Sequence, residues 1–145
     1  MRANQSEKGF TLIEMMIVLA VISIILSFSI LTLKSFSEMI QKKMFVTQLE
    51  SDLYYAHSYA LNRRETVVFS FSILSNEYNA VTATGEVIFV RKLPHSIYIE
   101  KTNLHSFSIT PRGTVSNFGT VNFRHNQKTF KMTVYIGRGR FSIEK

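Results

Sequence analysis

The feature that most constrains this chain is an uncharged apolar run close to its N-terminus. From Met15 to Leu33 the sequence reads MMIVLAVISIILSFSILTL, without an Asp, Glu, Lys or Arg, and extension back to Phe10 adds only Glu14. As a helix, residues 10–33 would be about 36 Å long at about 1.5 Å per residue, which exceeds the roughly 30 Å of a hydrocarbon core. We therefore predict that this segment spans a membrane.

Two other interpretations of the run fit less well. A buried helix of a soluble protein would need more surrounding core than the rest of a 145-residue chain can provide. A cleavable secretory signal has a shorter apolar region, of about 7–15 residues, followed by small residues at the cut. Here residues 27–30 (SFSI) offer a poor cleavage site, and the apolar run continues beyond them.

A second motif lies at the start of this run. A carboxylate inside a membrane-spanning segment is costly, yet Glu14 lies within the apolar run, and Lys8 and Gly9 directly precede Phe10. The string KGFTLIE, residues 8–14, resembles the cleavage and assembly signature of type IV pilins and type II secretion pseudopilins. The alternative is an interfacial glutamate beside an ordinary signal anchor.

The resemblance implies processing at this motif. In that family a prepilin peptidase cuts after the glycine on the cytoplasmic side and methylates the new N-terminal residue. Residues 1–9 would then be a leader, and cleavage between Gly9 and Phe10 would leave residues 10–145. Glu14 would serve assembly, because its carboxylate can neutralise the freed amino group of Phe10 in a neighbouring subunit and so convert two costly charges into one ion pair.

Helical periodicity continues past the apolar run. Apolar residues at spacings of three and four form one stripe, which predicts an amphipathic helix over residues 34–63. The stripe consists of Val46, Leu49, Leu53, Ala56 and Ala60. We expect Arg63-Arg64-Glu65 to end the helix, with cations at the negative end of its dipole. Major pilins commonly carry Gly or Pro in the first half of this helix, so the absence of both here favours a minor subunit or a stiffer, short pseudopilus.

From Thr66 the pattern changes to the two-residue alternation of β-strands. In the first predicted strand, residues 66–73, one face holds Val67, Phe69, Phe71 and Ile73. Further strands are predicted at residues 78–83, 87–90, 97–100, 106–110, 120–124, 129–136 and 140–143. The predicted fold is therefore α+β and type IV pilin-like. A long N-terminal helix, hydrophobic and transmembrane in its first half, would pack its second half on an antiparallel β-sheet head over residues 64–145.

The net charge of +7 is distributed unevenly. Residues 101–145 hold eight basic residues and one acidic residue, Glu144, so this segment accounts for the whole excess. Net charge bears on association rather than on fold. A basic surface of this kind is typical of proteins that bind nucleic acids.

Three C-terminal segments resemble a subgroup of minor pilins. Residues 107–113 (FSITPRG), 117–121 (NFGTV) and 133–140 (TVYIGRGR) resemble the H-type pseudopilins of type II secretion and the FimT-type pilins. The layout of the whole chain resembles the competence pseudopilins of Gram-positive bacteria. In FimT-type competence pilins a comparable C-terminal stretch is linked to DNA binding, which implies that role for Arg138 and Arg140.

Physical chemistry is consistent with that role. Two guanidinium groups on a glycine-rich loop can hold phosphates bidentately. Further candidates for the same surface are Lys131, Lys128, Arg124 and Arg112, and strand alternation predicts that Lys131 faces solvent. In the alternative interpretation the glycines form a tight hairpin and the arginines only keep its edges soluble.

Catalytic and metal-binding functions find little support. The four histidines, His57, His95, His105 and His125, lack metal-ligand spacing. Asp52 is the only aspartate, and the chain has no cysteine. We therefore expect no enzyme activity, no metal and no other cofactor.

Together these patterns predict a minor pilin or pseudopilin of a competence type IV pilus. It would span the cell membrane once before assembly and then stand on the cell surface in a filament needed for DNA binding and uptake. Its expected partners are other pilins of the filament, prepilin peptidase, the pilus assembly machinery, the membrane and, at the basic loop, DNA. The alternatives are a minor pseudopilin of a type II-like protein secretion system and an adhesive minor pilin.

Overall fold

The computed structural model describes residues 10–137 and 140–144, with the side chains of residues 29–35 left out. The expected leader, residues 1–9, lies outside the described residues. The chain divides into two compact units, residues 1–39 and residues 40–145. In the first unit the described structure is helical from Leu12, and every side chain from Phe10 to Phe28 is exposed.

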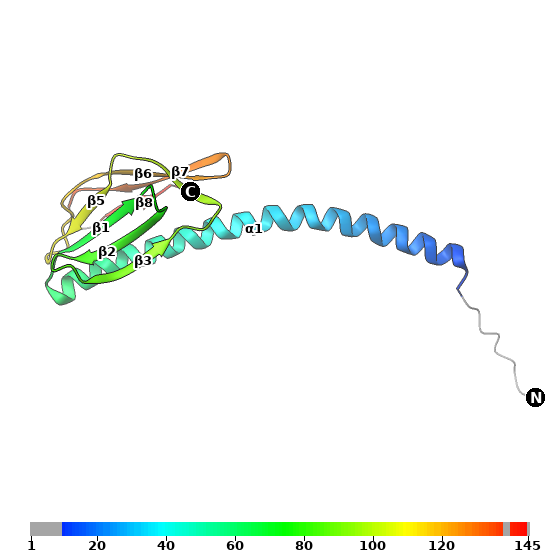
Figure 1. Cartoon of the computed structure of the whole chain (residues 1–145), viewed down its shortest axis with the longest axis horizontal. Helices are drawn as coiled ribbons and strands as arrows, with labels where there is room; N and C mark the ends of the chain where they lie inside the picture. Colours follow the sequence, from blue (N-terminus) through cyan, green and yellow to red (C-terminus); the bar gives the residue numbers. More distant parts are fainter. Residues whose placement is uncertain (1–9, 138–139, 145) are drawn as a thin grey trace, which may run out of the picture. The chain divides into compact units, whose positions relative to one another are not determined.

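One helix precedes eight strands (Figure 1). The helix α1 covers Leu12–Arg63, and the strands are β1 (Val67–Ser72), β2 (Glu77–Thr82), β3 (Val87–Lys92), β4 (Ile97–Thr102), β5 (Ser106–Ile109), β6 (Gly119–His125), β7 (Lys128–Val134) and β8 (Phe141–Ile143). Each of the eight predicted strands is present within two residues of its expected bounds, which confirms the α+β class.

The end of α1 follows from its last residues. Arg63 is the final helical residue, and Arg64 takes a left-handed conformation with φ of 54°. The amide of Glu65 then donates to the carbonyl of Ala60 at 3.3 Å, which satisfies one of the open carbonyls at the helix end. The predicted stop at residues 63–65 is therefore confirmed.

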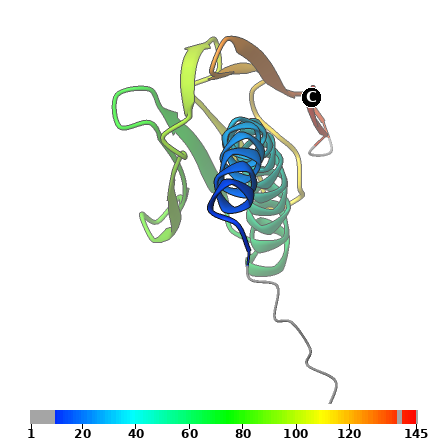
Figure 2. The same cartoon turned by 90° about the vertical axis from the view of Figure 1, so that its right-hand side faces the viewer.

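The strands form two antiparallel sheets, where the sequence suggested a single sheet region. Sheet A has the order β3-β2-β1-β5, and sheet B has the order β4-β6-β7-β8. In the view along the helix axis the two sheets cover different sides of the second half of α1 (Figure 2). Because α1 lies against both sheets, one helical face serves as the core for two layers.

The predicted stripe of α1 is that shared core. Leu49, Ala56 and Ala60 are fully buried, and Val46 and Leu53 are nearly so. These side chains meet the inward faces of the strands, which are buried at every second residue. The prediction from periodicity is confirmed for all five residues.

Phe45 extends this core and joins the two sheets. Its ring contacts Tyr78 of sheet A at a centroid distance of 6.4 Å, and it contacts Phe123 and Phe130 of sheet B at 5.3 and 6.2 Å. Phe71 of sheet A also contacts Phe123, at 6.3 Å. The edge-to-face geometry of these rings is the favourable one for aromatic pairs.

One residue of the first predicted strand was placed wrongly. Val67 and Phe69 are fully buried and Phe71 is 5% exposed, as expected, but Ile73 is 43% exposed. β1 ends at Ser72, and Ile73 lies in the turn that follows. The alternation of buried and exposed side chains therefore ends at Ser72, where the strand pairing of β1 ends.

The turn between β1 and β2 also closes an edge of sheet B. Asn76 has a φ of 51°, a conformation that asparagine tolerates. Its Nδ2 donates to the carbonyl of Ile97 at 2.8 Å, and its Oδ1 accepts from the amide of Ile99 at 3.1 Å. The side chain thus takes the place of a neighbouring strand at β4, which is an edge of sheet B.

Asp52 ties the helix to sheet A through a buried polar network. The hydroxyl of Tyr78 donates to Asp52 Oδ2 at 2.7 Å, Arg91 lies 3.3 Å from the same oxygen, and Gln48 donates to Oδ1 at 2.9 Å. Burial raises the pKa of Tyr78 far above its usual range, and the hydrogen bond to Asp52 raises it further. Tyr78 therefore remains a protonated donor, and Asp52 is a structural acceptor.

This network makes a testable prediction. Asp52→Ala should lower the free energy of unfolding by about 3 kcal/mol, because the buried Tyr78 hydroxyl loses its acceptor. Tyr78→Phe should cost only about 1 kcal/mol, because it removes the donor together with its need for a partner. Urea unfolding of the full chain in detergent, followed by near-ultraviolet circular dichroism, measures both. Equal effects of the two changes would contradict the network.

Candidate functional site

The N-terminal candidate site is built on the first turn of α1. The hydroxyl of Thr11 accepts from the amide of Glu14 at 3.3 Å, and the carbonyl of Thr11 accepts from the amide of Met15 at 3.2 Å. Thr11 is therefore the N-cap, and Glu14 holds the position at which a capping box carries its acidic residue. A carboxylate in the first turn also interacts favourably with the positive end of the helix dipole.

This local role of Glu14 was missed from the sequence. The signal was present, because a Thr followed three residues later by a Glu before an apolar run is a helix-start pattern. Phe10 directly precedes this cap and is 79% exposed. Gly9 lies outside the described residues, so the structure describes only one side of the expected cleavage point.

A long apolar surface follows this first turn. Large side chains from Leu12 to Phe28 are between 46% and 79% exposed. The hydroxyls of Ser23 and Ser27 donate back to the carbonyls of Leu19 and Ser23, both at 2.8 Å. This leaves the helix surface apolar even where its sequence is not. Over the residues whose side chains are described, no helix is both long enough and apolar enough to cross a membrane.

The C-terminal candidate site is the loop between β7 and β8. The amide of Tyr135 donates to the carbonyl of Arg140 at 2.9 Å, which closes the loop. Gly137 has a φ of 114°, a conformation that favours glycine. Arg140 is exposed, whereas Arg138 lies outside the described residues.

A short backbone contact fixes where this loop lies. The amide of Val115 donates to the carbonyl of Gly137 at 3.0 Å, and Val115 also forms a single antiparallel bridge to Ile109 of β5. Val115 therefore joins the edge of sheet A to the β7–β8 loop of sheet B. We call the Val115–Gly137 contact the sheet junction.

The sheet junction places a second turn beside the loop. Residues 110–114 connect β5 to Val115. The amide of Thr110 donates to the carbonyl of Thr114 at 2.9 Å, which closes the turn. The Nε2–H of His57 on α1 donates to the carbonyl of Gly113 in this turn at 3.0 Å. Arg112 is exposed in this turn.

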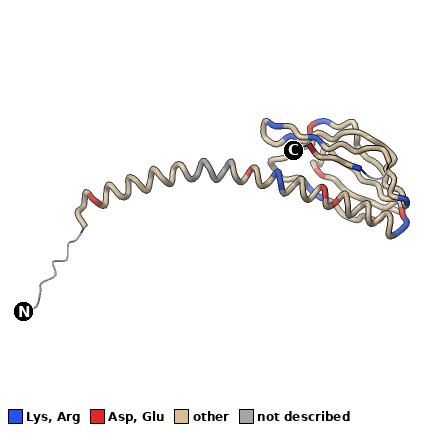
Figure 3. Tube along the Cα trace, turned by 180° about the vertical axis from the view of Figure 1, so that it is seen from behind, with Lys and Arg blue, Asp and Glu red and all other residues tan. Residues whose placement is uncertain are grey.

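The remaining predicted DNA-binding residues lie elsewhere on sheet B. Lys and Arg residues occur throughout the strand-bearing unit (Figure 3). Arg124 pairs with Glu100, and Lys131 pairs with Glu144 at 3.3 Å. The outward orientation predicted for Lys131 is confirmed, since its side chain is 46% exposed.

Lys128 is separated from the loop by the length of a strand. It begins β7, whose seven residues rise by about 3.3 Å each, so it lies about 20 Å along the strand from the β7–β8 loop. The structure therefore does not bring Lys128 and Arg124 together with Arg140. It brings Arg112 close to the loop.

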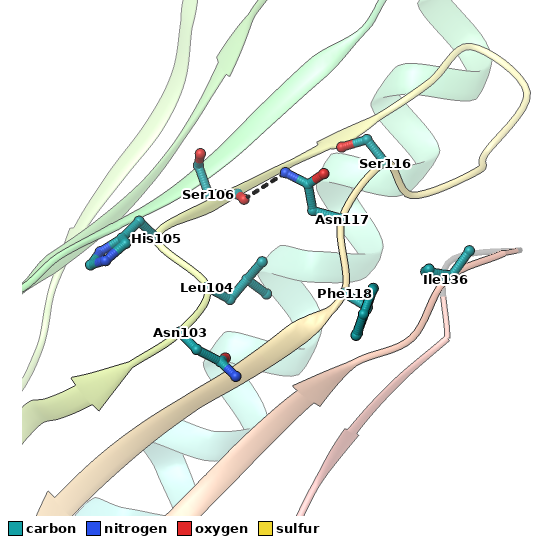
Figure 4. A pocket seen from close by; sticks show the side chains of 8 residues that line it. All are labelled: Asn103, Leu104, His105, Ser106, Ser116, Asn117, Phe118 and Ile136. Atoms are coloured by element: carbon teal, nitrogen blue, oxygen red, sulfur yellow. Dashed lines mark hydrogen bonds between the residues drawn. The ribbon is translucent and has the colours of Figure 1, made fainter.

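A groove lies on one side of the sheet junction (Figure 4). Its volume is about 390 Å³. It is lined by Asn103, Leu104, His105, Ser106, Ser116, Asn117, Phe118 and Ile136. Phe118 and Ile136 are 68% and 66% exposed, so the groove presents an apolar patch to solvent. The sequence motif at 117–121 pointed to this segment but not to a groove.

Two of the histidines lie inside the strand-bearing unit rather than on its open surface. His57 supports the turn at Gly113, and His125 is 8% exposed with no hydrogen-bond partner for its Nε2. Among the described side chains, no three His, Asp or Glu residues lie close enough to hold a metal ion.

Comparisons with known proteins agree with this geometry at both ends of the chain. Residues 4–30 match the family described as the prokaryotic N-terminal methylation motif. Residues 46–139 match the family described as type II transport protein GspH. The chain belongs to the GspH family of type IV pilins and pseudopilins. Members of this superfamily are structural subunits that assemble with other pilins and the pilus machinery, and the methylation motif marks a membrane-anchored pilus component.

Individual relatives of this GspH-family chain are distant. It is 26% identical to competence protein ComGD of Bacillus subtilis (strain 168) over 140 residues, which is 96% of this chain and 94% of ComGD. Two crystal structures of the type IV minor pilin FimU of Pseudomonas aeruginosa (strain PAO1) share its fold. Their TM-scores are 0.60 and 0.53 at 17% and 18% identity, covering 76% and 68% of this chain and 92% and 89% of FimU.

Proposed function

We propose that this chain is a minor pseudopilin of a competence type IV pilus, assembled into a surface filament that is needed for DNA uptake. The observation that carries the proposal is the likeness to a competence protein, ComGD, along 96% of this chain. The likeness includes both the N-terminal motif and the strand-rich unit, so it covers the parts that anchor a pilin and the parts that would give it a specific role.

The N-terminal segment would act in two stages. Before assembly, residues 10–33 would span the cell membrane once, and prepilin peptidase would cut after Gly9 and methylate Phe10. The exposed apolar surface from Leu12 to Phe28 supports this proposal, because burial of such side chains in a bilayer removes them from water. After assembly the same surface would pack against the helices of neighbouring subunits.

Glu14 would then act between subunits as well as within its own helix. Its backbone amide is held by Thr11, while its side chain is exposed. The carboxylate is therefore free to pair with the amino group of Phe10 in the next subunit, a pair that is strong where water is scarce. Such a contact would fix the axial step between subunits.

DNA would be contacted at the loop between β7 and β8. Arg140 is exposed, and no ion pair of it is found among the described residues. Arg124 and Lys131 are already paired with carboxylates, so each would have to give up a partner to bind phosphate. We therefore assign the contact to Arg138 and Arg140 and expect little from Arg124 and Lys131.

A second candidate function is a pseudopilin of a protein secretion system. The observation that favours it is the match of residues 46–139 to a family described by a type II transport protein. In that case the filament would act on secreted proteins, and DNA would not be a partner.

Loss of the gene separates these two functions. We expect deletion to abolish transformation by added DNA and to leave the set of secreted proteins unchanged, with both measured in the same cultures and a complemented strain as control. Normal transformation combined with lost secretion would support the secretion system and contradict the proposal.

Two substitutions test the role of Glu14 in assembly. Glu14→Gln keeps a side chain suited to a capping box but removes the charge, so it should enter the membrane normally and be nearly absent from sheared pili. Thr11→Ala removes the N-cap at a cost of about 1 kcal/mol but keeps the charge, so it should still assemble. Immunoblots of membrane and pilus fractions measure both. If Thr11→Ala fails and Glu14→Gln assembles, Glu14 serves only its own helix.

A further inference from the structure

The sheet junction brings two exposed arginines from distant parts of the sequence to one end of the strand-bearing unit. Arg112 precedes Val115 by three residues, and Arg140 follows Gly137 by three residues. The Val115–Gly137 hydrogen bond of 3.0 Å places the turn of Arg112 beside the β7–β8 loop, and the hydrogen bond of 2.9 Å from the amide of Tyr135 to the carbonyl of Arg140 places Arg140 in that loop. His57 holds the turn that carries Arg112 from the side of α1.

The segment that carries both arginines holds charged residues of one sign. No Asp or Glu occurs from Lys101 to Ile143. The two acids that flank this stretch, Glu100 and Glu144, are paired with Arg124 and Lys131 on the strands of sheet B. The two loops thus present cations without neighbouring carboxylates from their own segment, which suits a polyanionic partner.

The groove begins on the other side of the same junction. Ser116, Asn117 and Phe118 directly follow Val115, and Ile136 directly precedes Gly137. The side chains of Phe118 and Ile136 lie toward one side of the groove, and Asn103, directly after β4, also lines it (Figure 4). Its volume of about 390 Å³ falls within the range of small-ligand sites, about 300–1,000 Å³.

The groove offers the groups that recognise a nucleobase. The Nδ2 of Asn117 donates to the carbonyl of Ser106 at 3.5 Å, which leaves its Oδ1 as an acceptor. The Oδ1 of Asn103 accepts from the amide of Thr120 at 2.6 Å, which leaves its Nδ2 as a donor. Phe118 adds an exposed aromatic face. An aromatic ring beside amide donors and acceptors is the usual set of contacts to an unstacked base.

We propose that this groove receives an unpaired base of a DNA strand whose phosphates lie on Arg112 and Arg140, with the base stacked on Phe118. The proposal rests on the proposed function, in which DNA is a partner. It adds two DNA-contacting residues, Arg112 and Phe118, and a preference for single-stranded over duplex DNA. In a duplex the bases are stacked on one another and have no free face for Phe118, so duplex DNA would meet only the arginines.

Phe118 can be tested with an intrinsic reporter, because the chain has no tryptophan. Phe118→Trp in the full chain in detergent should bind oligothymidylate of about 20 nucleotides, longer than the 4–16 that one binding surface occupies. Its emission should be quenched as thymine stacks on the indole. Phe118→Leu should weaken oligothymidylate binding about fivefold or more and leave binding to a duplex of the same length unchanged. Phe118 is largely exposed, so neither change should disturb folding.

Arg112 is tested by charge removal against a matched control. Arg112→Gln should weaken the binding of both oligothymidylate and duplex DNA. For oligothymidylate, the slope of the logarithm of the binding constant against the logarithm of the salt concentration should fall by about 0.7 between roughly 50 and 200 mM salt. Lys92→Gln removes the same charge from sheet A, far from the junction in the sheet order, and should leave both unchanged.

Three results would overturn the proposal. The first is unquenched Phe118→Trp emission with unchanged oligothymidylate affinity of Phe118→Leu. The second is absence of DNA binding by the parent chain. The third is loss of pilus incorporation in Phe118→Leu with DNA binding intact, which would make the groove a contact between pilins. None of these contradicts a role in transformation, which the gene deletion tests separately.

Discussion

The fold of the strand-bearing unit depends on one stripe of α1 that serves two sheets at once. Phe45, Leu49 and Leu53 are buried between the apolar faces of the two sheets. Without the helix, each sheet would leave its apolar face exposed to water. The two sheets also meet directly, for example at the rings of Phe71 and Phe123. Burial of apolar surface on a common helix therefore provides most of the free energy that holds the two sheets together.

That arrangement decides where the functional loops lie. Because both sheets wrap the same helix, their free edges approach each other, and small contacts can join them. Asn76 caps β4, and Val115 bridges β5 to Gly137. The second of these contacts brings the turn that carries Arg112 beside the loop that carries Arg140. The surface proposed to bind DNA is thus a consequence of how the core closes.

Much of the fold could be predicted because it follows from local periodicity. The stripe from Val46 to Ala60, the strand bounds and the outward orientation of Lys131 each depend on residues that are near in sequence. Ile73 was misplaced because the apolar alternation in the sequence continues one residue beyond the end of β1. The division into two sheets was missed because periodicity carries no information about which strands pair.

The candidate sites also divide into features that a local sequence motif shows and features that depend on contacts between distant residues. Glu14 was found from a contiguous motif, although its place in the first helical turn, which Thr11 caps, was not predicted. The pairing of Arg124 with Glu100 depends on strands β4 and β6 lying side by side, and the proximity of Arg112 and Arg140 depends on a bridge between sheets. Such contacts join residues between about 20 and 30 positions apart, so no local pattern could show them.

Membrane release, subunit pairing and surface display all require that the chain is processed as a pilin. The most direct test is mass spectrometry of the N-terminal peptide from purified pili. We expect a peptide that begins at Phe10 and carries one methyl group on its amino nitrogen. An intact leader beginning at Met1, or a cut within residues 27–30, would contradict it.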